Sequence, residues 1–435
     1  MSPTLAYILG IIVLIAGLAI SVALHELGHM VPAKRFGVKV PEYFIGFGPR
    51  IWSIRRGETE YGVKAIWLGG YVKLLGMLPP ARPGRPDKPG SMVAEAREEA
   101  LAELGPDEQD RAFYRLSVPR KLLVMAGGIL TNLVLGIVCL ALALGAVGQY
   151  TATSTLSSVE PCVPAAVGAP GSQCASDSSD SASSVSPAVA AGMRAGDEIV
   201  SWNGVPTPAW ADVQAAIRSG GTEPADVVVR RDGTETTLSV TPVEVERTVT
   251  AADGSASTEL RPYVGIEPRA RTVRVAPSRV PGEVATAVGQ TLKAIITLPV
   301  GLYHSVAAGL GLEERRADGL VSLVGVGRIA GEVSSEGVGT GTVPFLARLS
   351  SMLSLLGSLN LALFAFNLVP LLPLDGGHVA GACWEGLRRL RARWRDRPDP
   401  GHVDTARMLP VGQVVFVALI VMAVVLIWVD VVAPF

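Results

Sequence analysis

Charge is scarce in this chain, and it is missing from its first long stretch. Asp, Glu, Lys and Arg make up 18% of the 435 residues and hydrophobic residues 49%, a balance too apolar for an ordinary soluble protein. The net charge of −1 gives no sign of the basic surface that binds nucleic acid. No charged residue occurs from Leu5 to Leu24, about the 20 residues that a helix needs to cross a bilayer. The composition therefore predicts several membrane spans.

Lysine and arginine are also missing from Met1–Thr4. A secretory signal begins with positive charge and has a shorter apolar core, so we expect the first run to be a retained span. We predict four spans in all, at residues 5–33, Leu122–Gly148, Leu349–Leu374 and Val411–Val429. We expect residues 283–310, which contain Lys293 and His304, to lie at the outer membrane face instead of forming a fifth span.

The positive charges predict the orientation of these spans. Lys34–Lys121 contains sixteen Lys and Arg, and Arg388–Arg397 contains six Arg. Lys and Arg concentrate in cytoplasmic loops, so both segments are predicted to be cytoplasmic, with the N- and C-termini outside. Within the first segment, Pro79–Asp110 is Pro-rich and then charged, and we expect a mobile insert.

Cysteine is rare as well, with four in the chain. Cys162 and Cys174 fall in the region predicted to be outside, where disulfides persist, and we expect them to be bridged. Two free thiols in a Ser-rich insert are the alternative. Cys139 and Cys383 lie at or beside spans and are expected to be small apolar residues of the packing.

The outer region contains the pattern of one small α/β domain. Ser186–Gly204 combines a short helix, a Gly stop and a strand that ends in an Asn-Gly turn. Trp210–Arg218 has helical spacing, and Val227–Val240 reads as a hairpin turning at Asp232-Gly233. This pattern resembles a PDZ domain of bacterial proteases, which adds an extended peptide to a sheet edge. The alternative is a domain that blocks access and binds no peptide.

The first chemical motif closes the first span, at His25-Glu26-x-x-His29. Residues four apart share one face of a helix, so His25 and His29 can bind one Zn²⁺ together. Glu26 can take a proton from a zinc-bound water. Ionisable residues at the end of a membrane helix are costly, which favours a functional role. Two histidines packed in a helix bundle by chance are the alternative.

The second motif is Asn367-Leu-Val-Pro-Leu-Leu-Pro-Leu-Asp-Gly-Gly-His378. Pro370 and Pro373 break the third span, and backbone that is not helical at membrane depth must be buried or line a wet cavity. Asp375 follows the break and can be the third zinc ligand, since a catalytic zinc has three protein ligands and one open position. About 20 residues of helix cover roughly 30 Å, and the two motifs end at similar depths near the cytoplasmic side.

Together these motifs resemble the site-2 protease family, above all the bacterial RseP-like intramembrane zinc proteases that cleave anti-sigma factors. The resemblance covers nearly the whole chain. It implies a zinc endopeptidase with ligands His25, His29 and Asp375, with Glu26 as general base and with Asn367 positioning substrate or stabilising the oxyanion. His378 lies outside the family's metal site.

The resemblance also implies a membrane-associated β-hairpin from Gly46-Phe-Gly48 to Leu75 that holds an unwound substrate. An ordinary hairpin turning near Gly57-Glu58 is the alternative. Ala126–Asn132 is similar to a family motif in the second span, but Gly128 replaces the usual proline. Asn132 can point to the active site and bind substrate, or it can be a helix-packing amide.

The expected fold is a multi-span α-helical membrane protein with four transmembrane helices, an inserted extracytoplasmic PDZ domain and a membrane-associated β-hairpin. The expected segments are 1–34 (first span), 35–120 (hairpin and loop), 121–150 (second span), 151–245 (PDZ domain), 246–345 (linker and interfacial helix), 346–386 (third span), 387–408 (arginine-rich loop) and 409–435 (fourth span).

The expected function is regulated intramembrane proteolysis in the bacterial cell membrane. The expected partners are the lipid bilayer, a single-pass substrate such as an anti-sigma factor and a site-1-type protease that cuts this substrate first, with no nucleic acid. Two alternatives stay open: another membrane zinc protease, which processes lipidated or signal peptides and takes a Glu as third ligand, and a non-catalytic PDZ scaffold.

Overall fold

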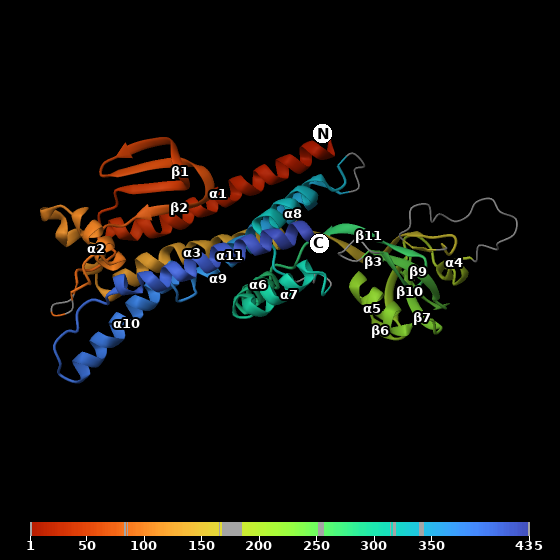
Figure 1. The fold of residues 1–435 in the computed structure, drawn as a ribbon. Helices are drawn as coiled ribbons and strands as arrows, with labels where there is room; N and C mark the ends of the chain where they lie inside the picture. The colour runs from red at the N-terminus through yellow and green to blue at the C-terminus, as the bar shows by residue number, and fades with distance from the viewer. Residues whose placement is uncertain are drawn as a thin grey trace. The chain divides into compact units, whose positions relative to one another are not determined.

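The computed structural model describes residues 2–433 apart from 82–83, 85, 165, 168–184, 251–255, 314, 316–318 and 339–342. The chain divides into a helical unit, residues 1–146, 275–306 and 318–432, and a β-rich unit, residues 147–274, 307–317 and 433–435. Figure 1 shows the long helices α1, α3 and α9 of the helical unit running side by side, with α11 packed against α8.

The helical unit has these elements in chain order: α1 (Pro3–Arg35), β1 (Glu42–Arg56), β2 (Thr59–Lys73), α2 (Met92–Ala102), α3 (Val118–Ala141, continued by a π turn to Val147), α6 (Val280–Ile296), α7 (Leu298–Gly309), α8 (Leu323–Ser335), α9 (Phe345–Asn367), α10 (Asp375–Trp394) and α11 (Leu409–Val432).

Helix α1 has clear start and stop signals around its apolar run. The Ser2 hydroxyl accepts a hydrogen bond from the Leu5 amide at 3.2 Å and caps the first turn. Lys34 and Arg35 occupy the last turn, where positive charge complements the helix dipole. Gly37 follows with a φ of +83°, a conformation that glycine adopts readily. The backbone N–H and C=O groups inside this helix thus form hydrogen bonds with one another, as those of a membrane span must.

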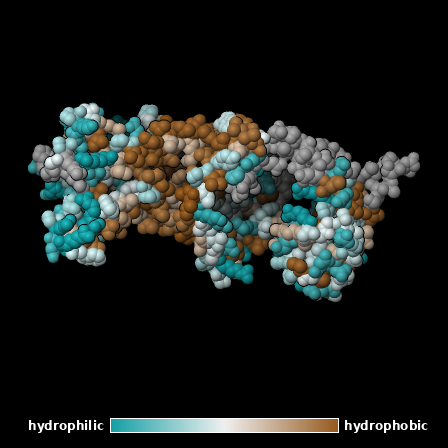
Figure 2. Space-filling model, turned by 60° about the horizontal axis from the view of Figure 1, so that its bottom comes forward, coloured by the Kyte–Doolittle hydropathy of each residue, from teal (hydrophilic) through white to brown (hydrophobic). Residues whose placement is uncertain are grey.

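Four helices among the described residues are long and apolar enough to cross a membrane: Pro3–Arg35, Val118–Val147, Phe345–Asn367 and Thr405–Val432. Figure 2 shows apolar residues gathered over the long helices and hydrophilic ones at the end that carries α2 and α10. The stretch expected at the membrane face forms α6 and α7, which are bent by 74° and would make a fifth span only if the pair is counted as one.

The third span ends earlier than its expected end at Leu374. Helix α9 stops at Asn367, and α10 starts at Asp375, so the segment expected as 346–386 is two helices. The turn between them folds back tightly, because a Cβ on Gly376 would lie 2.3 Å from the Val369 carbonyl oxygen. Pro370 follows the end of α9, and Gly376 lets the start of α10 pack closely against the turn. Asp375 therefore lies in the first turn of α10.

The hairpin of β1 and β2 turns at Gly57-Glu58, where the alternative interpretation placed its turn, but it forms four paired segments. Residues 42–45 pair on one side with 60–63 and on the other side with 70–73. Gly46 and Gly48, with φ of +90° and +83°, bend β1 between its two halves. Segment 70–73 is therefore an edge, paired on one side within the part of the chain that the structure describes.

Part of the stretch Pro79–Asp110, which was expected to be a mobile insert, forms helix α2. Helix α2 carries Arg97, whose side chain is 4% exposed and forms ion pairs with Asp87 at 2.7 Å and Asp404 at 2.8 Å. A buried guanidinium needs such partners, and they tie this stretch to the segment before α11.

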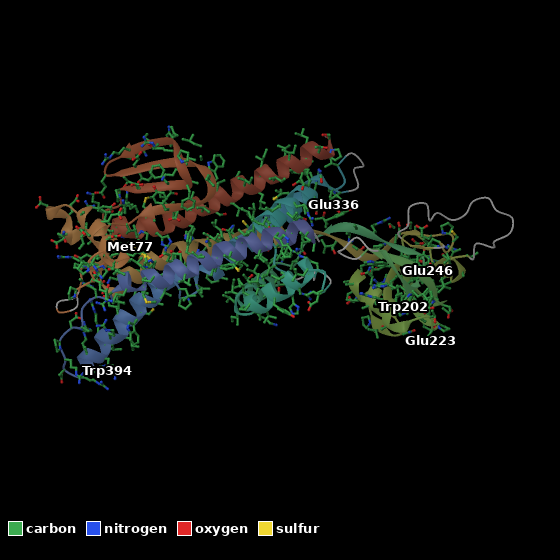
Figure 3. All side chains as sticks on the ribbon, in the orientation of Figure 1. Met77, Trp202, Glu223, Glu246, Glu336 and Trp394 are labelled. Carbon is green, nitrogen blue, oxygen red and sulfur yellow. The ribbon has the colours of Figure 1, made fainter. Side chains whose placement is uncertain are left out.

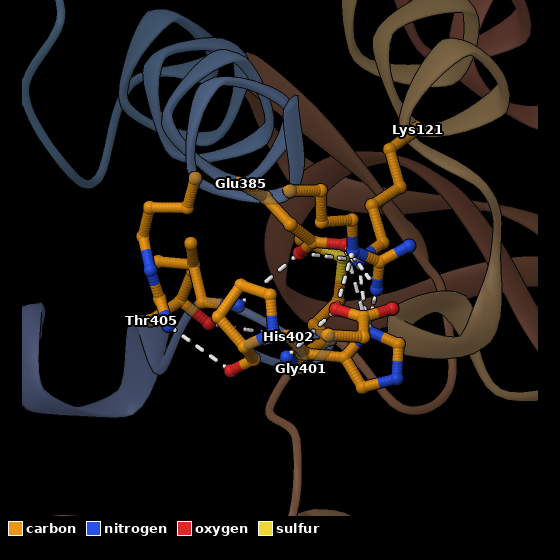
Figure 4. A network of polar contacts seen from close by, with 11 residues as sticks. Lys121, Glu385, Gly401, His402 and Thr405 are labelled. Atoms are coloured by element: carbon orange, nitrogen blue, oxygen red, sulfur yellow. Dashed lines mark hydrogen bonds and ion pairs between the residues drawn. The ribbon is translucent and has the colours of Figure 1, made fainter. Parts of the chain in front are cut away.

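Helix α10 is fixed to the start of α3 by a buried ion pair. The Lys121 ammonium donates to both carboxylate oxygens of Glu385, at 3.0 and 2.8 Å, and Arg389 pairs with the same carboxylate at 3.0 Å. Figure 4 shows His402 beside this pair, where its Nδ1 atom lies 3.5 Å from Oε1 of Glu385. At the far end of α10, Trp394 extends away from the bundle and is 80% exposed (Figure 3).

The β-rich unit contains two sheets and two short helices. The larger sheet has the order β11-β3-β5-β7-β8, with β6 paired to β5, and the smaller has the order β10-β9-β4. The bounds are β3 (Gln149–Val159), β4 (Ala166–Val167), α4 (Pro187–Ala190), β5 (Glu198–Trp202), β6 (Val205–Pro206), α5 (Trp210–Gly220), β7 (Ala225–Arg231), β8 (Thr234–Val240), β9 (Val243–Thr250), β10 (Ala256–Tyr263) and β11 (Ile266–Val273).

The predicted helix from Trp210 and the predicted hairpin at Asp232-Gly233 are confirmed. Trp202 points into the core of this unit, where it packs with buried aliphatic residues (Figure 3). The expected domain end at 245 is too early, because β11 pairs with β3 and so belongs to the sheet. The predicted bridge to Cys174 falls outside the described residues.

The ion pair that holds α10 predicts an acid-sensitive fold. Burial of Glu385 raises its pKa, but the contacts with His402 and Lys121 outweigh this effect and lower the pKa from 4.5 to about 2. The carboxylate therefore stabilises the folded state fully above about pH 4.5, and this stabilisation is lost as the pH falls toward about 2. We expect the apparent melting temperature of the wild type to fall in this pH range.

The matched variant is Glu385→Gln, which leaves the Lys121 ammonium without a counter-charge and should cost about 3–5 kcal/mol at neutral pH. Its melting temperature should change less with acid than that of the wild type. Glu98→Gln, on the exposed face of α2, serves as control. Parallel pH profiles of wild type and Glu385→Gln would contradict this account of the ion pair.

Candidate metal centre

The metal centre starts from one face of α1. His25 and His29 lie one turn apart, their rings are 4.8 Å apart at 83°, and their Nε2 atoms are 3.2 Å from each other. Both rings are largely buried, with side-chain exposures of 12% and 6%. Two imidazole nitrogens that face one another inside a membrane helix bundle require a shared partner.

Asp375 supplies that partner from the first turn of α10. Its Oδ2 atom lies 3.2 Å from Nε2 of His25 and 3.3 Å from Nε2 of His29. These three residues form a group that could hold a metal ion, with all ligand atoms within 4.8 Å of one another. The structure thus brings together the two motifs that the sequence singled out.

The three atoms fit a zinc ion. In a tetrahedral site with bonds of about 2.0–2.1 Å, neighbouring ligand atoms are about 3.3 Å apart, which is the spacing of this triangle. Oδ2 of Asp375 is buried and has no hydrogen-bond donor among the described residues. Two imidazoles and a carboxylate are the ligand types zinc takes in catalytic sites, which leave one position open.

Helix α3 contacts the outer nitrogens of both rings. Nδ1 of His29 lies 2.8 Å from the Val124 carbonyl oxygen, and Nδ1 of His25 lies 3.1 Å from the side-chain amide of Asn132. Such contacts fix the orientation of a ligand imidazole. The sequence motif pointed to Asn132, but a main-chain carbonyl such as that of Val124 leaves no signal in the sequence.

Glycines let α1 and α3 approach closely at the centre. A Cβ on Gly127 would lie 1.9 Å from the Gly28 carbonyl oxygen, and a Cβ on Gly128 would lie 2.2 Å from Nε2 of His29. Gly128, which stands where the family pattern has proline, therefore makes room for the His29 ring. The crossing accepts no side chain at these positions.

Glu26 lies between the histidines and the hairpin. It interacts electrostatically with His25, His29 and Asp375, and the Val72 backbone amide lies within hydrogen-bonding reach of its carboxylate. A Cβ on Gly70 would lie 3.4 Å from Cγ of Glu26. The edge segment 70–73 thus runs beside the proposed base.

The hairpin is also tied to α1 directly, since the Tyr43 hydroxyl donates to the Ala23 carbonyl at 2.6 Å. Gly46 and Gly48, expected to bind substrate, lie at the bend of β1 that places the edge segment. Their visible role is to shape the hairpin.

The other residues discussed from the sequence, Asn367 and His378, do not belong to the group of His25, His29 and Asp375. Asn367 is the last residue of α9, and no hydrogen bond of its side chain is found in the described part of the chain. His378 is not in the metal-binding group. Asn360, which the sequence analysis did not select, is 1% exposed and donates to the Ser21 hydroxyl at 3.0 Å, one turn before His25.

The close contact between Gly128 and the His29 ring gives a direct prediction. Gly128→Ala places a methyl group where the His29 ring lies and should reduce zinc affinity at least tenfold, since ligand geometry tolerates little displacement. Zinc binding is measured by competition with a chromophoric chelator. Gly289→Ala, on α6 with open space around it, is the control, and wild-type zinc affinity in Gly128→Ala would contradict the crowding.

Comparisons with known proteins agree with this centre. The chain matches peptidase family M50 over residues 13–396. It is 33% identical to the zinc metalloprotease Rip1 of Mycobacterium tuberculosis over 430 residues, 95% of each chain. It is 31% identical to Rip1 of Mycolicibacterium smegmatis over 424 residues, 94% of this chain and 93% of the relative. It is 27% identical to the metalloprotease MmpA of Caulobacter vibrioides over 398 residues, 90% of each.

Both the zinc cofactor and the enzyme class predicted from the sequence are confirmed by these matches. The chain belongs to peptidase family M50, the site-2 protease family, and it is a multi-pass membrane zinc metalloprotease.

Proposed function

We propose that this protease cuts within the membrane span of single-pass proteins, with an anti-sigma factor as substrate, after a site-1-type protease has removed the outer part. The observation that carries this proposal is the meeting of Asp375 with His25 and His29 within 3.3 Å, at the ends of apolar helices and beside a sheet edge. A zinc site among apolar helices would reach peptide bonds that a soluble protease does not reach.

The proposed ligands are His25, His29 and Asp375, with Glu26 as general base. Bound zinc would polarise the scissile carbonyl and favour ionisation of the attacking water. The Glu26 carboxylate takes the proton of this water and passes it to the leaving amine. An aspartate as third ligand supports this reading over a membrane protease with a glutamate there. Asn367, at the end of α9, is proposed to orient the substrate carbonyl.

The edge segment 70–73 is the proposed seat of the substrate backbone. A peptide bond inside a helix is covered by its own hydrogen bonds and side chains, so the substrate must unwind before cleavage. An extended peptide added to this edge pairs its main chain with the sheet, beside Glu26. Gly46 and Gly48 would support this step by shaping the hairpin.

The proposed orientation places both termini outside a bacterial cell membrane and releases the product to the cytoplasm. The sixteen positive charges of 34–121 and the six arginines of 388–397 support it. The β-rich unit is then extracytoplasmic, and as a PDZ domain it would bind a peptide end or exclude substrates that still carry a bulky outer domain.

Two substitutions test the chemistry on purified protein in lipid discs with a transmembrane substrate. Glu26→Gln should lower kcat about 10²–10⁴-fold, the usual contribution of a general base, with zinc retained. Asp375→Asn should lose zinc, because it replaces a charged ligand. Glu98→Gln should match the wild type. Wild-type cleavage by Glu26→Gln would refute the proposed mechanism.

A third substitution tests the hairpin. Gly46→Val puts a Cβ 2.7 Å from the Ile66 carbonyl oxygen at a φ of +90°, so it should distort the edge segment and raise KM with zinc unchanged. Gly57→Val is its matched control, since Gly57 has a φ of +62° in the same hairpin but open space around it. Equal KM values in the two variants would argue against substrate binding at this edge.

A further inference from the structure

Asn132 is a polar side chain in the middle of an apolar helix, and it touches the metal centre from outside. It is 1% exposed, and its amide nitrogen Nδ2 lies 3.1 Å from Nδ1 of His25, an arrangement that turning the amide over exchanges for its oxygen. Its amide oxygen is buried and has no partner among the described residues. Burying an amide oxygen without a hydrogen bond in an apolar setting costs free energy. The oxygen of Asn132 therefore needs a hydrogen-bond donor.

The chemistry of a ligand histidine supplies that donor. Nε2 of His25 faces His29 and Asp375, so it is the nitrogen that would bind a metal. A neutral imidazole that binds metal through Nε2 carries its proton on Nδ1. Nδ1–H then needs an acceptor, and the amide of Asn132 is the group within reach. An amide carries acceptor and donor on one pivot, so it can turn its oxygen toward this proton.

The other ligand histidine has the equivalent arrangement. Nδ1 of His29 faces the Val124 carbonyl oxygen at 2.8 Å. Val124 and Asn132 are eight residues apart on α3, close to two helical turns, so one face of α3 contacts both rings. Nδ1 of His29 faces an acceptor, the Val124 carbonyl, and we expect Nδ1 of His25 to face an acceptor as well.

We propose that Asn132 is a positioning residue that accepts the Nδ1 proton of His25 and thereby holds Nε2 toward the zinc, and that it does not bind substrate. The inference rests on the proposed ligand set of His25, His29 and Asp375. It replaces the sequence-based interpretations of Asn132 as a substrate contact or a helix-packing amide.

The test compares two substitutions of similar size. Asn132→Leu cannot accept a proton, and Asn132→Asp can only accept. Zinc affinity of each full-length variant is measured by chelator competition, and the visible spectrum of the cobalt-substituted protein reports ligand geometry without any turnover. We expect Asn132→Leu to bind zinc 10–100-fold more weakly, the usual cost of losing such a contact (~1.4–2.8 kcal/mol), with an altered cobalt spectrum. Asn132→Asp should keep wild-type zinc affinity and spectrum.

Asn360→Leu is the matched control, because Asn360 is an equally buried amide whose contacts are with Ser21 and the Leu356 carbonyl. It should lower the melting temperature and leave the cobalt spectrum unchanged. Wild-type zinc affinity in Asn132→Leu, equal loss in Asn132→Asp, or a raised KM with normal zinc binding would each overturn the inference.

Asp375→Asn, measured in the same titration, separates this inference from the proposed function. If Asp375→Asn loses zinc while Asn132→Leu does not, only the role of Asn132 fails. If Asp375→Asn keeps zinc, the ligand set itself is wrong.

Discussion

A carboxylate and two imidazoles buried among apolar helices are stable only when each polar atom has a partner. This constraint accounts for much of the helical unit. A bound metal would satisfy the inner atoms, Nε2 of both rings and Oδ2 of Asp375, and α3 contacts the outer nitrogens. The close crossing of α1 and α3 exists because no side chain separates Gly28 from Gly127. Packing and coordination therefore depend on the same few positions.

The helix break at Pro370 solves a second problem. A continuous third span would carry its polar residues past the depth of His25 and His29. Helix α9 ends at Asn367 and α10 begins at Asp375, which brings the Asp375 carboxylate, in the first turn of α10, to the two histidines. The glycines that follow allow the turn to close on itself.

The sequence predicted what depends on spacing and residue type. The His25–His29 spacing, the Pro-Leu-Asp turn and the charge-free spans follow from helix geometry and from the cost of charge in lipid, and the structure has them. It could not predict the acceptor for His29, because that atom belongs to the main chain. Nor could it predict the four-segment hairpin, since pairing of 42–45 with both 60–63 and 70–73 depends on a bend and not on alternation.

Ion pairs between residues far apart in the sequence could not be predicted for a related reason. The buried pair of Arg97 and Asp404 joins residues more than three hundred positions apart, and no local pattern marks it. The end of the β-rich unit was set too early because β11 pairs with β3 across more than a hundred residues.

The ion pair between Lys121 and Glu385 fixes one point of α10, so that a rotation of this helix about that point moves Asp375. Glu385 and Asp375 are ten residues apart on one rigid helix, about 15 Å along its axis, so a tilt of roughly 10° about that point would carry the carboxylate through about 2.6 Å. That displacement exceeds the length of a zinc–oxygen bond of about 2.0–2.2 Å. The buried ion pair between Lys121 and Glu385 would consequently limit the movement of the candidate metal centre from about 15 Å away along α10.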